Sequence, residues 1–178
     1  IDKHIHILEN RPAAKFPTLG SPSAPVTIEF FINLGNARSA NAHRILSELA
    51  ARHPKRLRVI YRLADRRERS SNLAQIFGRE AFEQGRFFEF LAAFYGKRHR
   101  PPVSRDYPKV ARRAGVDYRR VQEALESMRH DQLLNANHLY WRRMQVQHLP
   151  GVLINGHHAA RSNDLESLVA LYDRAYDE

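Results

Sequence analysis

The clearest pattern along the chain is a pair of short apolar runs with an amphipathic segment between them. Val26 to Ile32 is almost entirely β-branched or aromatic, which is typical of a central strand covered on both faces. Residues 39–50 repeat apolar side chains on one helical face and stop before Pro54, and Leu57 to Leu63 forms a second apolar run. A strand, a short crossover helix and another strand predict parallel pairing with a right-handed connection.

From about Leu73 to Met144 the apolar residues recur at helical spacing. Gly85 separates an aromatic-rich pair of helices, and Gly115 has the position of a helix C-cap. Asp117 is expected to cap the helix that follows it. The other predicted helices of this block are Asp106 to Arg113, Tyr118 to Met128 and about Asp131 to Met144.

Strand patterns also stand near both ends of the chain. His4 to Leu8 alternates polar and apolar residues like a half-buried strand, and residues 9–24, rich in proline and small residues, are expected to form a connector. Gly151 to Gly156 predicts a strand that ends in an Asn-Gly turn, with His157 to Ala160 returning as its partner. A last helix is expected behind residue 162 or 163. The predicted order is strand, strand-helix-strand, helical insertion, hairpin and helix.

Length and charge limit the number of domains and the classes of binding partner. A chain of 178 residues with 43% hydrophobic composition is enough for one domain, or one domain with an insertion, around a sizeable core. No apolar run approaches the roughly 18 residues that a membrane span needs. The formal net charge of +10 comes mostly from scattered arginines. Because short clusters such as Arg66 to Arg69 and Lys97 to Arg100 lack interleaved aromatics, nucleic-acid binding is disfavoured.

Ten histidines raise the question of a metal site. His4 and His6 would share one face of the first strand, whereas the adjacent His157 and His158 would point to opposite faces. No Asp, Glu or Cys stands at a matching spacing, and such sites take three or four ligands, so we expect no native metal site and no cofactor. His43 lies on the first helix, where partial burial or solvation on the helix surface is the ordinary expectation.

Several segments follow one another in a characteristic order from about Leu19 onward. They are Gly20 to Phe30, Ser71 to Ala74, Ala81 to Phe90, Gly115 to Asp117, Val121 to Leu125 and His148 to Gly156. Together they resemble the DsbA-like thioredoxin-fold family of disulfide oxidoreductases. The resemblance implies an α/β thioredoxin fold with an inserted helical subdomain, and it suggests a periplasmic or extracytoplasmic location.

The same resemblance implies a domain organisation. Residues 1–178 would form a single DsbA-like domain. Its thioredoxin core would consist of residues 20–63 and 146–178, and the inserted helical subdomain would cover about residues 70–145. The family's loop before its cis proline falls on His148 and Leu149, so Pro150 is expected to be the cis proline.

The chain departs from the family at the residues that carry its chemistry. The family presents a Cys-x-x-Cys pair at a helix N-terminus, where the helix dipole and unpaired N–H groups lower the pKa of the first thiol. Here those four positions are Gly35, Asn36, Ala37 and Arg38, and the chain contains no cysteine. Glycine and arginine cannot serve as nucleophile or leaving group in thiol–disulfide exchange. A cation also opposes the dipole at that helix end, so Arg38 is read as an ordinary solvated side chain rather than an anion anchor.

The leading hypothesis is therefore a redox-inactive domain, not an enzyme, that binds an extended peptide or protein partner beside the former active-site loop. One alternative is a non-redox, glutathione-dependent isomerase or transferase on the same fold, for which Ser39 is a weak candidate nucleophile without a neighbouring His–Asp partnership in sequence. A weaker alternative is an arginine-rich nucleic-acid binder. The expected binding groove consists of Gly35, Asn36, Ala37, Arg38, His148, Leu149 and Pro150.

Overall fold

A computed structural model of the chain describes residues 15–64 and 73–158. The predicted strand His4 to Leu8, with His4 and His6, and the helix expected behind residue 162 or 163 lie outside the described residues, as does the end of the hairpin beyond residue 158. The account below concerns the described parts of the chain.

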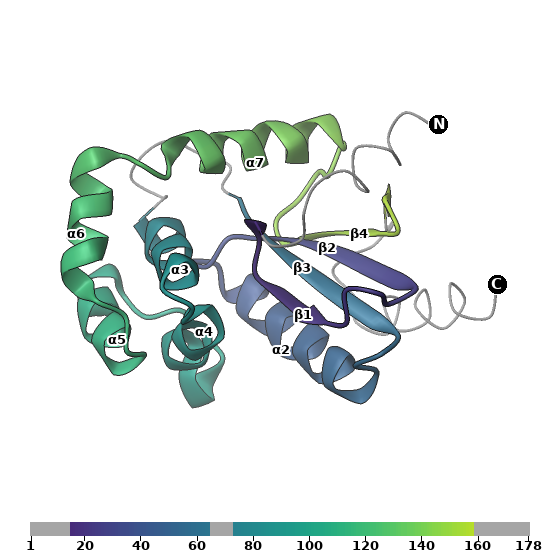
Figure 1. Ribbon diagram of the computed structural model, residues 1–178, viewed down its shortest axis with the longest axis horizontal. Coiled ribbons are helices and arrows are strands. Elements are labelled where there is room, and N and C mark those ends of the chain that lie inside the picture. Colours follow the sequence, from purple (N-terminus) through teal and green to yellow (C-terminus); the bar gives the residue numbers. More distant parts are fainter. Residues whose placement is uncertain (1–14, 65–72, 159–178) are drawn as a thin grey trace.

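The centre of the fold is a five-stranded sheet in the order β1-β3-β2-β4-β5 (Figure 1). β2 and β3 are parallel, with Val26 opposite Leu57 and Ile32 opposite Leu63, which confirms the predicted strand-helix-strand unit. The other neighbours are antiparallel. The strands are β1 (Thr18–Gly20), β2 (Val26–Ile32), β3 (Leu57–Leu63), β4 (Gly151–Ile154) and β5 (His157–His158).

The prediction of a connector over residues 9–24 is wrong for residues 18–20, because Thr18–Gly20 forms edge strand β1. Thr18 lies opposite Ile60 and Gly20 lies opposite Arg58. The three residues of β1 are half-buried or exposed and show almost no alternation of apolar and polar side chains, so the sequence pattern does not indicate a strand. β1 depends instead on backbone pairing with β3. Gly20 has φ +84° and the position of its missing Cβ would be 1.9 Å from Leu57 O, so only glycine allows the close approach.

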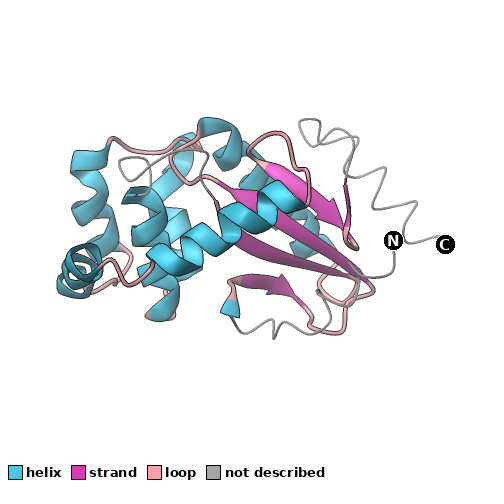
Figure 2. Ribbon diagram, turned by 90° about the horizontal axis from the view of Figure 1, so that it is seen from above, coloured by secondary structure: helices cyan, strands magenta, loops and turns pink. Residues whose placement is uncertain are grey.

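Helices cover both faces of the sheet (Figures 1 and 2). α2 (Ala37–Arg52) packs on one face, and α7 (Asp131–Arg143) crosses the other. The remaining helices of the block inserted between β3 and β4 gather beyond one end of the sheet (Figure 1). They are α3 (Leu73–Glu83), α4 (Phe87–Tyr95), α5 (Tyr107–Arg113) and α6 (Tyr118–Ser127), with short 3₁₀ turns η2 (Gly96–Arg98) and η3 (Ser104–Asp106).

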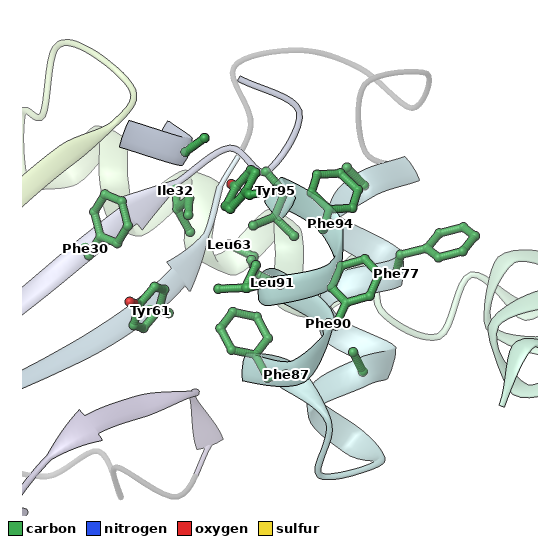
Figure 3. Close-up of a cluster of buried hydrophobic side chains, with 14 of the residues drawn as sticks. Phe30, Ile32, Tyr61, Leu63, Phe77, Phe87, Phe90, Leu91, Phe94 and Tyr95 are labelled. Atoms are coloured by element: carbon green, nitrogen blue, oxygen red, sulfur yellow. The ribbon is translucent and has the colours of Figure 1, made fainter. Parts of the chain in front are cut away.

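The alternation along β2 divides the buried side chains between the two sheet faces. Phe30 joins the larger core, in which residues of β2 and β3 meet the aromatic side chains of α3 and α4 (Figure 3). Its neighbour Phe31 belongs to a second cluster with Tyr140, Trp141 and Leu149 under α7 and β4. Both β2 faces are therefore covered, as the apolar run predicts.

One acidic residue interrupts the apolar run of β2. Glu29 is only 2% exposed, and its carboxylate accepts hydrogen bonds from Arg62 Nε and from Tyr140 Oη, the latter at 3.0 Å. The Arg62 guanidinium lies 4.4 Å from the ring centre of Phe16 and 4.5 Å from that of Tyr140. The second core thus contains a buried ion pair sandwiched by aromatic rings, a contact between two strands that neither apolar run reveals.

Candidate functional site

The loop between β2 and α2 is shaped by two asparagine side chains. Asn33 Oδ1 accepts a hydrogen bond from the Gly35 amide at 3.0 Å, and Asn36 Oδ1 accepts one from the Arg38 amide at 2.8 Å. Asn36 has extended backbone angles, so it is the N-cap of α2. The prediction that the helix starts at Ser39 is therefore wrong by two residues, because the cap lets helical geometry begin at Ala37.

The side chain of Gln75 holds the start of this loop by hydrogen bonds to the backbone. This side chain is fully buried at the beginning of α3 and donates to Ala64 O at 2.8 Å and to Ile32 O at 3.4 Å. Its Oε1 accepts from the Leu34 amide at 3.4 Å. One amide side chain thus joins the carboxyl ends of β2 and β3 by contacting three backbone groups, of which Ile32 O also accepts from the Ala64 amide at 2.9 Å.

The segment around Pro150 lies at the same end of the sheet. Phe31 is paired with Gly151, so the next step of the register brings Pro150 beside Ile32, where the loop begins. The peptide bond between Leu149 and Pro150 is cis, the isomer that the sequence resemblance implies. The Leu149 side chain packs in the second core, whereas His148 is exposed. Within residues 15–64 and 73–158, the backbone of Leu149 makes no hydrogen bond.

A hollow of about 620 Å³ opens on the other side of the loop. It contains Gly35, Asn36 and Ala37 of the predicted site, while Arg38, His148, Leu149 and Pro150 are outside it. The opposite wall comes from α3, η3 and α5, none of which the sequence analysis assigned to the site. The lining residues are Asn33, Gly35, Asn36, Ala37, Leu73, Ala74, Ser104 and Tyr107.

Tyr107 gives this hollow a hydrogen-bond donor. A Cβ atom added to Gly35 would lie 4.0 Å from Tyr107 Oη, so the hydroxyl faces the loop at the position of the family's first cysteine. Burial raises the pKa of Tyr107, which keeps the hydroxyl protonated. No local sequence signal marks Tyr107 as part of the site, because it reaches the loop only through the packing of α5.

Ser39 is unsuited to act as a nucleophile. Its side chain is fully buried, and in the described part of the chain its Oγ has no hydrogen-bond partner that could take up a proton. Among the same residues, no three His, Asp or Glu side chains are grouped as a metal site. No helix in the described ranges combines the length and apolar character required to cross a bilayer.

His43 lies on the inner side of α2, two turns behind the loop. Its Nδ1 is 2.9 Å from Tyr61 Oη and 3.2 Å from Ser47 Oγ, and its ring contacts Tyr61 and Tyr95. Burial, with a smaller contribution from the charge of His99, lowers the pKa of His43 from 6.5 to about 4. The imidazole is therefore neutral near pH 7, in line with the expected partial burial, and its Nδ1 lies within hydrogen-bond distance of both the Tyr61 and Ser47 hydroxyls.

This burial predicts a specific acid sensitivity. In the unfolded chain His43 binds a proton near pH 6.5, whereas the folded chain binds it only near pH 4, so acidification favours the unfolded state across this window. We expect His43 to account for a loss of about 3 kcal/mol of unfolding free energy between pH 7 and pH 4. Urea unfolding of the protein and of His43→Gln at both pH values measures this difference. His148→Gln changes an exposed histidine and serves as the control, so it should keep the full pH dependence of the unfolding free energy. If the unfolding free energy of His43→Gln fell with pH as steeply as that of the unmodified protein, His43 would not be the source of the acid sensitivity.

We compared the sequence and the structure with known proteins. A family model described as Thioredoxin matches residues 14–174. A thioredoxin-like oxidoreductase from Silicibacter pomeroyi DSS-3 superposes with a TM-score of 0.77 at 20% identity, covering 95% of each chain. Oxidised BdbD from Bacillus subtilis gives 0.78 at 14% identity, covering 94% of this chain and 96% of the other. The thiol-disulfide exchange protein alpha-DsbA2 from Wolbachia pipientis gives 0.72 at 16% identity, with 89% and 86% covered.

No curated protein matches the chain. At these identities the structural likenesses establish the fold, which confirms the predicted α/β thioredoxin fold of DsbA-like form. The family model covers nearly the whole chain, whereas the positions of the Cys-x-x-Cys pair hold Gly35, Asn36, Ala37 and Arg38. The chain therefore belongs to the thioredoxin family and lacks the cysteine pair of its disulfide oxidoreductases.

Proposed function

We propose that the chain is a redox-inactive thioredoxin-fold protein that binds an extended peptide, or an extended segment of a partner protein, beside the loop from Asn33 to Asn36. The observation that carries the proposal is the open hollow of about 620 Å³ against Gly35, Asn36 and Ala37. A scaffold of this family with an open groove and no thiol is suited to holding a ligand and not to exchanging disulfides with it.

Redox inactivity follows from the chemistry of exchange. Thiol–disulfide exchange needs a thiolate to attack and a second sulfur to leave, and the chain contains no cysteine. Gly35 offers no side chain, and the guanidinium of Arg38 carries no nucleophilic lone pair at ordinary pH. We therefore expect no reduction of a test disulfide and no oxidation of a dithiol peptide.

The two sides of the loop would contribute different contacts to a peptide. Near Pro150, the side chain of Leu149 is buried in the second core, and the backbone of Leu149 makes no hydrogen bond within the described ranges. This backbone can therefore pair with the extended main chain of a peptide. In the hollow, the hydroxyls of Ser104 and Tyr107 can hydrogen-bond to the peptide. The proposed groove joins both sides, so His148 and the exposed Arg38 would stand at its margins.

A glutathione-dependent enzyme is a poorer fit to the same site. Such an activity needs a polar group at the helix N-terminus to stabilise the glutathione thiolate. Gly35 supplies no such group and Ser39 is fully buried, so within the described residues the helix end offers no nucleophile. The Tyr107 hydroxyl faces the loop from α5 and could donate to a thiolate, which is why glutathione has to be tested directly. We therefore treat glutathione binding as an outcome to be tested and not as the proposal.

The test blocks the hollow without unfolding the protein. An array of unstructured decapeptides is screened for binding, and fluorescence anisotropy then measures the affinity of the tightest one. Ala37 is exposed at the start of α2, so Ala37→Trp should fill the hollow and weaken binding at least about tenfold. Ala51→Trp, an exposed alanine near the other end of α2, is the matched control.

Three outcomes of this experiment would count against the proposal. The first is equal binding by the protein and Ala37→Trp, which would place the peptide elsewhere. The second is that no peptide of the array binds. The third is that glutathione alone binds and is displaced by Ala37→Trp, which would favour the enzyme alternative.

A further inference from the structure

A second hollow, of about 610 Å³, lies between the end of α4 and α5. These two helices pack side by side (Figure 1), and the segment 101–107 separates this hollow from the candidate groove. Its wall holds five cationic side chains and one carboxylate, Asp106, which gives a net formal charge of +4. The five cations are Lys97, Arg98, Arg100, Lys109 and Arg113.

The cations of this hollow have no side-chain partners among the residues that the structure describes. All five are exposed, and none makes a side-chain hydrogen bond or ion pair with another residue of the described ranges. Other cations of the chain do pair, as Arg44 does with Glu48 and Arg86 with Glu89. Lys109 and Arg113 even stand four residues apart on α5, a spacing at which like charges repel. The positive charge here therefore does not hold the described elements together.

The backbone between α4 and α5 gathers these charges around one concave surface. Gly96 and His99 have left-handed φ values of +54° and +47°, and the Arg100 amide bonds back to Tyr95 O at 3.3 Å. This turn brings residues on both sides of His99 to the hollow. Phe94 and Val110 are buried and give it an apolar floor.

We propose that this hollow binds a small soluble ligand that carries two or more phosphate groups. Its volume falls within the range of about 300–1,000 Å³ of small-molecule sites. A single carboxylate would offset one charge of four, whereas linked phosphates bring several negative charges to one place and match the planar fork of arginine. The concave shape suits a compact ligand better than a flat membrane surface. The proposal is independent of peptide binding in the candidate groove.

Calorimetric titration of the full chain with inorganic tripolyphosphate tests this site. Lys109→Gln combined with Arg113→Gln should weaken binding about tenfold or more, because two of the five cations are removed. The matched control is Arg52→Gln combined with Lys55→Gln. It removes the same charge from two exposed positions, the last residue of α2 and a residue shortly after it. The control should bind within about twofold of the unmodified protein, since it leaves the hollow intact.

Thermal unfolding checks that each variant folds, and Lys97→Gln with Arg98→Gln replaces the first pair if it does not. Equal weakening in the pocket and control variants would overturn the proposal, because net charge alone would then explain binding. Equally tight binding of hexaglutamate would overturn it in favour of an acidic peptide. Preference for phosphatidylglycerol vesicles or for an oligonucleotide over tripolyphosphate, or no binding at millimolar tripolyphosphate, would also overturn it.

Discussion

Replacing Glu80 with alanine is expected to lower the free energy of unfolding by about 3–5 kcal/mol. Glu80 lies on α3 and is fully buried, so its charge depends entirely on partners from the neighbouring elements. Removing the carboxylate would leave those partners, including two arginines, partly desolvated and without a counter-charge. Its contacts are Arg120 Nε at 3.3 Å, His130 Nε2 at 2.9 Å, Gln84 Nε2 at 3.1 Å and a close ion pair with Arg129.

The balance of effects on this carboxylate also fixes the sign of its pH dependence. Burial alone would raise the pKa of Glu80, but hydrogen bonds from Arg129, His130 and Gln84 outweigh it and lower the pKa below 4.5. The unfolded chain therefore takes up the proton first on acidification. The stabilisation is complete above about pH 4.5 and is lost as the pH falls through the pKa of the folded state.

Urea unfolding of the protein, of Glu80→Ala and of Glu83→Ala measures the effect. Glu83 is one turn away on α3 and forms an ion pair with Arg79, but its side chain is 39% exposed, so its loss should cost no more than about 1 kcal/mol. A cost for Glu80→Ala similar to that of Glu83→Ala would show that the cluster does not hold α3 to α6 and the start of α7.

The sequence was sufficient to locate elements whose stability depends on local patterns. β3 has the predicted bounds, Leu57–Leu63, because a run of this length that contains Val59, Ile60 and Tyr61 is typical of a strand and too short for a buried helix. The predicted Asn-Gly turn is confirmed, since Asn155 and Gly156 both have left-handed φ values of +47° and +79°. The predicted cap is also confirmed, as Asp117 Oδ1 accepts from the Arg119 amide at 2.9 Å.

The sequence did not reveal the contacts that join distant segments. Glu29 and Arg62 lie on different strands, and nothing near either residue indicates the other. Glu80 meets Arg129 and His130 about fifty positions later, so no helical spacing connects them. The far wall of the candidate hollow was missed for the same reason. A polar residue within an apolar helical pattern, such as Glu80, is the one signal that could have been followed.

Substituting Gly35→Cys and Arg38→Cys together is expected to create a disulfide that closes under mild oxidation. Gly35 lies outside the left-handed backbone region, and an added Cβ would meet only Asn33 Oδ1 at 3.4 Å and Tyr107 Oη at 4.0 Å. Arg38 is exposed, so losing its side chain removes no packing. The two positions flank the Asn36 cap across the N-terminus of α2, the arrangement in which the family places its cysteine pair.

The thiol introduced at position 35 is expected to be acidic, with a pKa well below the free value of about 8.5. The positive end of the α2 dipole and its unpaired amide groups favour a thiolate there. The Tyr107 hydroxyl, which burial keeps protonated, is close enough to donate a hydrogen bond to that thiolate. Adding Tyr107→Phe should therefore raise the thiol pKa again without preventing the disulfide.

Thiolate absorbance against pH gives the pKa, and insulin reduction gives the activity, with the unmodified protein as the inactive baseline. The control pair is Glu48→Cys with Ala51→Cys, which has the same spacing on exposed positions of α2 but lies far from its N-terminus, so neither thiol should be acidic. A pair at positions 35 and 38 that does not close, or a thiol no more acidic than the control, would mean that the loop has lost the family's geometry. The proposed peptide groove would then lose its structural basis, because it assumes that only the sulfur atoms have been lost.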